Sequence, residues 1–196
     1  MNRRHVLMSV AAAAVLAACG RDKPAYQSID ISGVDYAKGF RLTDQHGKFR
    51  TLEDFRGKVV VVFFGFTQCP DVCPTSMTEL AEARRLLGPD GDKVQGIFIT
   101  VDPERDTPEV LKAYMANFDP SFVALRGTPE ETAKVAQDFK VYYKKVEGKT
   151  PGSYTMDHTA ASFVIDPQGR PRLYTRYGTG PQPLADDIRL LLREGA

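Results

Sequence analysis

The chain has 196 residues, of which 42% are apolar and 26% are charged, and its formal net charge is +1. These proportions are typical of a soluble globular protein and exclude a disulfide-rich miniprotein, an intrinsically disordered chain and a polytopic membrane protein. A net charge so near zero also argues against a protein that binds nucleic acid through its phosphates, so we expect no nucleic-acid partner. Only three cysteines occur, and much of the functional argument depends on them.

The first 18 residues have the composition of a bacterial export signal. Arg3 and Arg4 precede an apolar run over 6–18, and such a run is too short to cross a hydrocarbon core of about 30 Å. The Leu-Ala-Ala-Cys segment that ends at Cys19 resembles a lipobox. We therefore predict a lipoprotein signal peptide over 1–18, exported by the Sec or the twin-arginine route, and lipidation of Cys19.

The remaining chain divides into a tether and one domain. Residues 19–39 are polar and loosely patterned, and we predict a lipidated tether there. Residues 40–196 are long enough to bury a core without help from a metal or a disulfide, so the metal-free domain is expected to be folded. The lipid would hold this domain at a membrane surface outside the cytoplasm, in an oxidising compartment.

The pattern of apolar residues and of helix-capping residues predicts the elements of the domain in chain order. We expect strands at 40–43, 48–52, 58–66, 94–101, 122–125, 160–166 and 170–177, and helices at 74–87, 107–118, 128–139 and 184–193. Residues 141–146 are expected to belong to an inserted hairpin. This order predicts an α/β fold, a thioredoxin-like mixed sheet flanked by helices, with an N-terminal β-hairpin and the inserted hairpin.

Cys69 and Cys73 lie between an apolar strand and a helix that we expect to begin at Pro74. Cys73 is thus placed at a helix N-terminus, where unpaired amides and the macrodipole favour a thiolate. One helical turn would bring the two Cα atoms to about 6 Å, a separation that a disulfide can bridge. A thiolate is both a nucleophile and a metal ligand, so this spacing alone does not separate redox chemistry from metal binding.

His158 narrows the choice. It directly precedes the strand at 160–166, a position that faces the cysteine loop in a thioredoxin-type sheet and usually holds a cis-proline in redox enzymes of that fold; the nearest proline here is Pro151. Cys69, Cys73 and His158 would form a soft ligand set suited to Cu(I), or to Cu(II) with an added oxygen donor. Structural zinc would need a fourth ligand.

Other residues that could act at such a site have ordinary explanations. His46 lies in the turn of the N-terminal hairpin and is expected to be solvated. Met115 and Met156 are expected in the core or on the surface rather than as thioether ligands. Asp102 follows the strand at 94–101 and could orient a ligand or meet a partner, although turn formation or helix capping explains it equally well.

Three segments resemble Sco/SenC proteins in order and spacing. They are Cys69-Pro-Asp-Val-Cys-Pro74, Val101-Asp-Pro-Glu-Arg-Asp-Thr-Pro-Glu109, and Asp157-His158 followed by Phe163-Val-Ile-Asp166. The resemblance covers roughly residues 35–195. It implies a copper metallochaperone that binds copper through Cys69, Cys73 and His158 and matures the binuclear copper centre in subunit II of cytochrome c oxidase.

The resemblance also implies a place and partners for the chain. It points to the periplasmic face of the bacterial cytoplasmic membrane, with subunit II, a periplasmic copper donor and a thiol reductant as partners. Many relatives use a transmembrane helix as their anchor, whereas here the lipobox at Cys19 replaces it. Gly20 supplies no retention signal for the inner membrane, which leaves the outer membrane as an alternative.

Two other functions use the same cysteines and leave open whether the chain is an enzyme. A thiol-disulfide oxidoreductase that reduces the copper-site cysteines of subunit II would need only Cys69 and Cys73 as its catalytic, disulfide-forming pair. A peroxidase is the weaker reading, because Thr67-Gln68-Cys69 lacks the Pro-x-x-x-Thr-x-x-Cys pattern of peroxiredoxins. Activity in cells that survives His158→Ala but is lost with either cysteine change would favour the oxidoreductase. Absence of peroxide-dependent oxidation at catalytic rates would dismiss the peroxidase.

Overall fold

An eight-stranded mixed sheet forms the centre of the computed structural model, which describes residues 25–195. Its strand order is β1-β10-β9-β4-β5-β6-β2-β3, and β7 and β8 pair separately as a two-stranded sheet. The strands are β1 (Ile29–Asp30), β2 (Arg41–Asp44), β3 (Phe49–Thr51), β4 (Val59–Gly65), β5 (Val94–Thr100), β6 (Val123–Arg126), β7 (Tyr143–Glu147), β8 (Tyr154–His158), β9 (Ala161–Ile165) and β10 (Pro171–Arg176).

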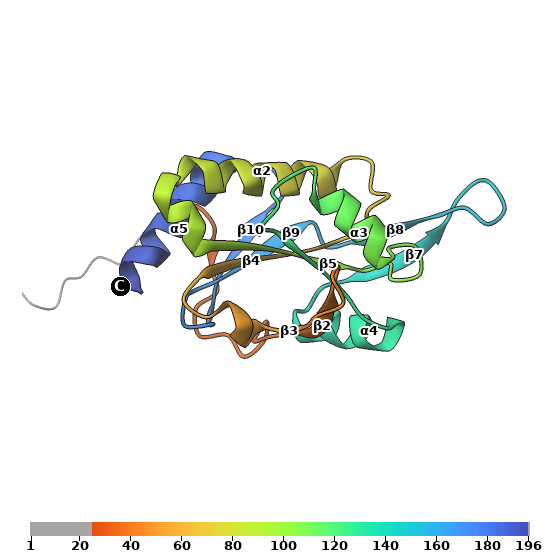
Figure 1. Cartoon of the computed structure of the whole chain (residues 1–196), viewed down its shortest axis with the longest axis horizontal. Coiled ribbons are helices and arrows are strands. Elements are labelled where there is room, and N and C mark those ends of the chain that lie inside the picture. The colour runs from red at the N-terminus through yellow and green to blue at the C-terminus, as the bar shows by residue number, and fades with distance from the viewer. Residues whose placement is uncertain (1–24, 196) are drawn as a thin grey trace, which may run out of the picture.

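Helices cover both faces of the sheet. They are α2 (Val72–Leu86), α3 (Pro108–Met115), α4 (Pro129–Asp138) and α5 (Pro181–Glu194), with short 3-10 helices at Leu52–Phe55 and Gly88–Lys93. Figure 1 shows α2, α3 and α5 on one side of the sheet and α4 on the other, beside β2. Among the described helices, none combines the length and the apolar character that crossing a bilayer would require.

The two central strands, β4 and β5, form the buried centre of the sheet. Every residue of β4 and of β5 is buried, and the two strands run parallel with Val59 opposite Val94. Continuous β-branched and aromatic runs of this kind are the pattern of strands covered on both faces. Because β4 also pairs with β9, the loops that leave β4 and enter β9 are held at the same end of the molecule.

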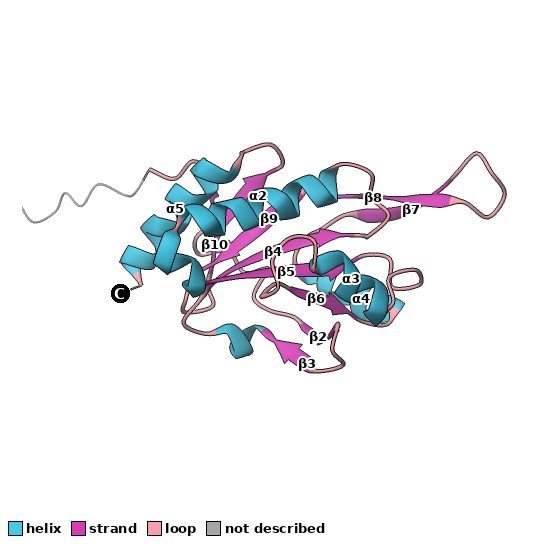
Figure 2. Ribbon diagram, turned by 45° about the horizontal axis from the view of Figure 1, so that its top comes forward, coloured by secondary structure: helices cyan, strands magenta, loops and turns pink. Residues whose placement is uncertain are grey.

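Sequence and structure agree on the architecture. The mixed α/β sheet of thioredoxin type is confirmed, as are the N-terminal hairpin β2–β3 and the inserted hairpin β7–β8. The inserted hairpin extends away from the sheet and its loop is the outermost part of the molecule (Figure 2). β8 ends at His158, so the candidate ligand terminates a strand of this hairpin.

The predicted tether differs from the structure in its second part. Ile29 and Asp30 pair with β10, and Ala37 is fully buried. The buried carboxylate of Asp187 on α5 accepts hydrogen bonds from the backbone amides of Gln27 and Ser28, at 2.7 and 2.9 Å. Because Asp187 lies 160 residues from Gln27 in the chain, no local sequence pattern predicts that this polar segment is held against the domain. The signal peptide and Cys19 lie outside the described residues.

Helix α2 begins two residues before the predicted start. Asp71 occupies its N-cap position, so Pro74 is the third helical residue rather than the first. The first four amides of a helix have no partner within it, and a proline in that turn therefore loses no hydrogen bond. Cys73 is consequently inside the first turn, and Cys69 lies in the loop before it.

Candidate metal centre

The structure brings together the three residues that the sequence singled out. The sulfur atoms of Cys69 and Cys73 and a ring nitrogen of His158 all lie within 4.8 Å of one another. They come from the loop after β4, the first turn of α2 and the last residue of β8. Both cysteines are free thiols. Three soft ligand atoms at one point form a site that one small metal ion can occupy.

The two sulfur atoms differ in their surroundings. Cys69 is half-buried, and its sulfur accepts a hydrogen bond from the Cys73 amide at 3.4 Å. A free amide of the first helical turn is thus directed at the sulfur of Cys69. The thiol of Cys73 lies deeper, at 0% exposure.

Burial overrides the expected effect of the helix N-terminus on Cys73. Loss of contact with water raises the pKa of the Cys73 thiol well above its ordinary value, and a hydrogen bond from the Phe66 backbone opposes this rise only in part. A thiolate buried without a cation is costly, and a helix terminus supplies only a fraction of a charge. The expectation of a thiolate at Cys73 is therefore wrong for the metal-free protein.

His158 presents its Nε2 atom to the sulfurs. Nε2 lies 3.4 Å from the sulfur of Cys73, while Nδ1 lies 3.1 Å from the backbone carbonyl of Thr159. A carbonyl oxygen only accepts hydrogen bonds, so Nδ1 carries the ring proton and Nε2 keeps its lone pair. Burial lowers the pKa of His158. The ring is thus neutral at neutral pH, which is the form that binds a metal.

Aromatic side chains fix the plane of the imidazole. The rings of Phe63 and Phe66 each meet the His158 ring edge-on, with centroids 5.9 Å away. Such T-shaped contacts restrict rotation of the ring. Sequence reasoning did not assign this role to the two phenylalanines, which it placed in a buried strand.

Gly65 permits Cys73 to lie against the sheet. A Cβ atom at this position would lie 2.8 Å from the Cys73 sulfur and 2.8 Å from the ring of Phe98. Neither neighbour can retreat, because both are fully buried. A glycine inside an apolar strand is a recognised sign of close approach by another group, so this residue could have been found from the sequence.

The site opens to solvent through a cavity of about 250 Å³. Cys69, Asp71, Met156 and His158 are among the residues that line it. Met156 is buried at 8% exposure, as expected for a core residue, but its position on this wall places it beside the candidate ligands. An ion or a partner side chain can therefore reach the sulfur of Cys69 from outside.

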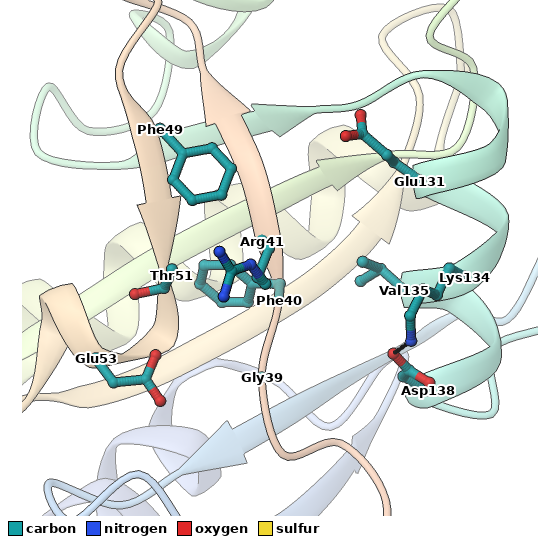
Figure 3. A pocket seen from close by; sticks show the side chains of 10 residues that line it. All are labelled: Gly39, Phe40, Arg41, Phe49, Thr51, Glu53, Glu131, Lys134, Val135 and Asp138. Atoms are coloured by element: carbon teal, nitrogen blue, oxygen red, sulfur yellow. Dashed lines mark hydrogen bonds and ion pairs between the residues drawn. The ribbon is translucent and has the colours of Figure 1, made fainter.

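A larger cavity of about 470 Å³ lies away from this centre, between the β2–β3 hairpin and α4. In Figure 3 the guanidinium of Arg41 projects into it; its carbon lies 5.5 Å from the centroid of Phe49. Lys134 and Asp138 form an ion pair of 2.7 Å on the opposite wall. Its lining includes none of the three candidate ligands.

The remaining predicted residues lie outside the ligand cluster. His46 is exposed in the turn after β2, and Met115 is buried on α3, both as expected. Asp102 is buried, and its carboxylate accepts a hydrogen bond from the hydroxyl of Tyr154 at 2.9 Å. It therefore contacts the strand that carries His158 rather than His158 itself, and it also forms the turn at 102–106.

Comparisons with known proteins all find Sco proteins. A family model described as SCO1/SenC matches residues 30–193. An SCO2-like protein of Rickettsia felis is 32% identical over 171 residues, which cover 86% of this chain and 83% of that protein. The structure of Bradyrhizobium japonicum ScoI with copper bound shares 48% sequence identity with a TM-score of 0.72, and the match covers 79% of this chain and 98% of that chain.

One further solved structure is described in redox terms. It concerns a disulfide switch in BsSco, a member of the Sco family of cytochrome c oxidase assembly proteins. That chain is 25% identical with a TM-score of 0.63, and the match covers 83% of this chain and 96% of that one.

Proposed function

The chain belongs to the SCO1/SenC family, and on that premise we propose that it is a copper metallochaperone whose Cys69, Cys73 and His158 carry the ion. The observation that carries the proposal is the meeting of two thiol sulfurs and a lone-pair nitrogen within 4.8 Å. The copper-bound structure of the Bradyrhizobium japonicum relative supports the identity of the metal.

The chemistry of the donor set favours Cu(I) as the cargo. Two sulfurs and one imidazole are soft ligands, which suit Cu(I), whereas Cu(II) would add an oxygen donor from water or protein. Binding exchanges the Cys73 proton for the metal, so the raised pKa of that thiol makes uptake dependent on pH. Release to a partner returns a neutral, buried thiol, which lowers the cost of leaving the site empty.

The proposed destination is the binuclear copper centre of cytochrome c oxidase subunit II. The description of BsSco as a member of a family of oxidase assembly proteins supports this destination. We further propose that Cys19 carries a lipid at the periplasmic face of the cytoplasmic membrane, with the outer membrane as the alternative. A periplasmic copper donor and a thiol reductant complete the proposed partners.

A copper titration of the reduced protein tests the metal site. We expect one Cu(I) per chain, and a loss of affinity of at least about tenfold in Cys69→Ala, Cys73→Ala and His158→Ala, measured by competition with a Cu(I) chelator. His46→Ala is the matched control, because His46 is exposed and remote in the fold. A His158→Ala protein with unchanged affinity would contradict the three-ligand site.

A second function, thiol-disulfide exchange, is favoured by the position of Cys69. Its sulfur belongs to a half-buried residue that lines the cavity, and it accepts a hydrogen bond from the Cys73 amide. In this reaction the Cys69 thiolate attacks a partner disulfide, and Cys73 then displaces the reduced partner. Two electrons pass to the partner and Cys69–Cys73 becomes a disulfide. Oxidase assembly in cells that persists in His158→Ala but is lost in Cys69→Ala and in Cys73→Ala would favour thiol-disulfide exchange over copper delivery.

A further inference from the structure

The segment 101–109, which the sequence marked as a motif, supplies none of the three candidate ligands. Its turn at 102–106 nevertheless contacts both the cysteine loop and β8. We propose that Arg105 is a positioning residue that fixes the hairpin carrying His158 against the loop carrying Cys69, and so sets the separation of imidazole and sulfurs. This inference rests on the proposed copper site and adds the residue that keeps it assembled.

Arg105 contacts both sides of the site at once. Its Nη1 atom donates hydrogen bonds to the side-chain oxygen of Gln68, at 3.0 Å, and to the backbone carbonyl of Tyr154, at 2.9 Å. Gln68 immediately precedes Cys69, and Tyr154 begins the strand that His158 ends. The guanidinium also stacks on the Tyr154 ring, 3.6 Å from its centroid. One planar group therefore joins the two ligand-bearing segments.

The turn that carries Arg105 is itself fixed to the cysteine loop. Asp106 is fully buried, and its carboxylate accepts hydrogen bonds from the Thr67 amide, at 3.1 Å, and the Thr67 hydroxyl, at 2.6 Å. The hydroxyl of Thr100, at the end of β5, donates to the same carboxylate. The base of Arg105 is thus held by the central sheet, and only its far end reaches the hairpin.

Asp102 orients the guanidinium of Arg105. Its carboxylate accepts hydrogen bonds from Arg105 Nε and from the hydroxyl of Tyr154. Arg105 is thereby aligned for its contact with the Tyr154 carbonyl, and the tyrosine ring is kept beneath the guanidinium. The sequence offered two explanations for Asp102, orientation of a ligand and formation of a turn. Both apply, because Asp102 forms the turn at 102–106 and its carboxylate contacts the hairpin that carries His158.

The hairpin needs such a contact because its own pairing does not fix it. β7 and β8 hydrogen-bond to each other and form a sheet separate from the eight-stranded one. A two-stranded hairpin is marginally stable alone. Residues 159–160 join β8 to β9, so rotation there would move His158 relative to Cys73. Tyr154 lies four residues away along β8, about 13 Å, and a contact at that distance resists the rotation.

The substitution Arg105→Lys tests this role in the full-length chain. Lysine keeps a positive charge beside buried Asp102 but lacks the planar guanidinium, in which Nε bonds Asp102 while Nη1 reaches Gln68 and the Tyr154 carbonyl. The matched control is Arg126→Lys. Arg126 also holds the turn, by donating to the Pro103 carbonyl at 3.0 and 3.1 Å, but the hydrogen bonds of its guanidinium go to that carbonyl and not to the cysteine loop or the hairpin.

The expected result is a loss that depends on His158. Arg105→Lys should weaken Cu(I) affinity about tenfold to hundredfold, as changes to residues that orient metal ligands do. In the His158→Ala background the same change should alter affinity less than about twofold, because there is no imidazole left to position. The Cu(II) complex of Arg105→Lys should also lose the imidazole nitrogen coupling in its electron paramagnetic resonance spectrum. Arg126→Lys should match the unmodified protein.

Each other outcome overturns the inference. Unchanged affinity in Arg105→Lys, an equal loss in the His158→Ala background, or an equal loss in Arg126→Lys would each show that Arg105 does not act through His158. If His158→Ala alone binds copper like the unmodified protein, the proposed function fails as well. If Arg105→Lys does not fold, Gln68→Ala removes one end of the contact at an exposed residue, and the same dependence on His158 is required of it.

Discussion

Cys69 and Cys73 carry the same functional group but differ in their exposure to solvent. Cys69 lines the 250 Å³ cavity and receives an amide hydrogen bond, whereas Cys73 is fully buried and lies close to Gly65. In either proposed function an incoming ion or disulfide meets Cys69 first. Cys73 completes the reaction from inside, so its burial determines the order of events.

This difference predicts the order of alkylation in the reduced, metal-free protein. Burial raises the pKa of Cys73 and hides its sulfur, so at pH 8 iodoacetamide should modify Cys69 at least about tenfold faster than Cys73. Fragmentation mass spectrometry at early times locates the first label. In urea the two rates should converge. Equal rates in the folded protein would show that Cys73 is accessible and that the assignment of roles is wrong.

The base and the outer end of the β7–β8 hairpin differ in their contacts. His158 pairs with Tyr143 at the base, and Glu147 pairs with Tyr154 before the outer loop at 148–153. The contacts that position His158 involve Tyr154 and residues nearer to the sheet. The outer loop takes part in none of these positioning contacts, so its conformation should not affect the metal centre.

Replacing 148–153 by the two-residue turn Asn-Gly tests this division. Asn-Gly suits a tight hairpin turn, so Glu147 and Tyr154 can remain paired. We expect Cu(I) affinity to stay within about twofold of the unmodified protein in the chelator competition, because His158 keeps its place. A loss as large as that of His158→Ala would show that the outer loop contributes to the metal centre.

The elements differ in how far the sequence reveals them. The continuous apolar runs of β4 and β5 are unambiguous, and the cysteine spacing with His158 predicts the three candidate ligands that the structure brings together. β1 has two residues and no pattern, and the preference of proline for the first helical position predicts a start for α2 that is two residues too late. The contacts of Arg105 span 37 and 49 residues, so no local pattern could predict them.

At the scale of the whole molecule, the N-terminal segment is fastened to the C-terminal helix. Asp187 holds the amides of Gln27 and Ser28, and the hydroxyl of Tyr26 donates to Glu194 at 2.7 Å. Figure 1 shows this end of α5 and the β7–β8 hairpin at opposite ends of the molecule. The point where the chain enters the domain is thus far from the metal centre.

Removing the carboxylate should release this segment without disturbing the metal centre. We expect Asp187→Ala to lower the free energy of unfolding by about 2 kcal/mol, because two amides lose a charged acceptor, and to expose residues 25–31 to proteolysis. Urea unfolding and limited digestion measure the two effects, and copper affinity should be unchanged. Asp186→Ala is the control, since Asp186 pairs with Arg189 at the exposed surface of the same helix. Equal effects of the two changes would contradict this role for Asp187.

The contact of Asp187 with the N-terminal segment shortens the length of chain between the proposed lipid anchor and the folded domain. With Cys19 as the proposed lipidated residue, the segment from Cys19 to Tyr26 spans at most about 24 Å, whereas a tether over 19–39 would span at most about 70 Å. The volume within reach falls roughly 25-fold, since it scales with the cube of the radius. A membrane-bound acceptor inside that volume would meet the proposed copper site at a correspondingly higher effective concentration, and an acceptor beyond it would be out of reach.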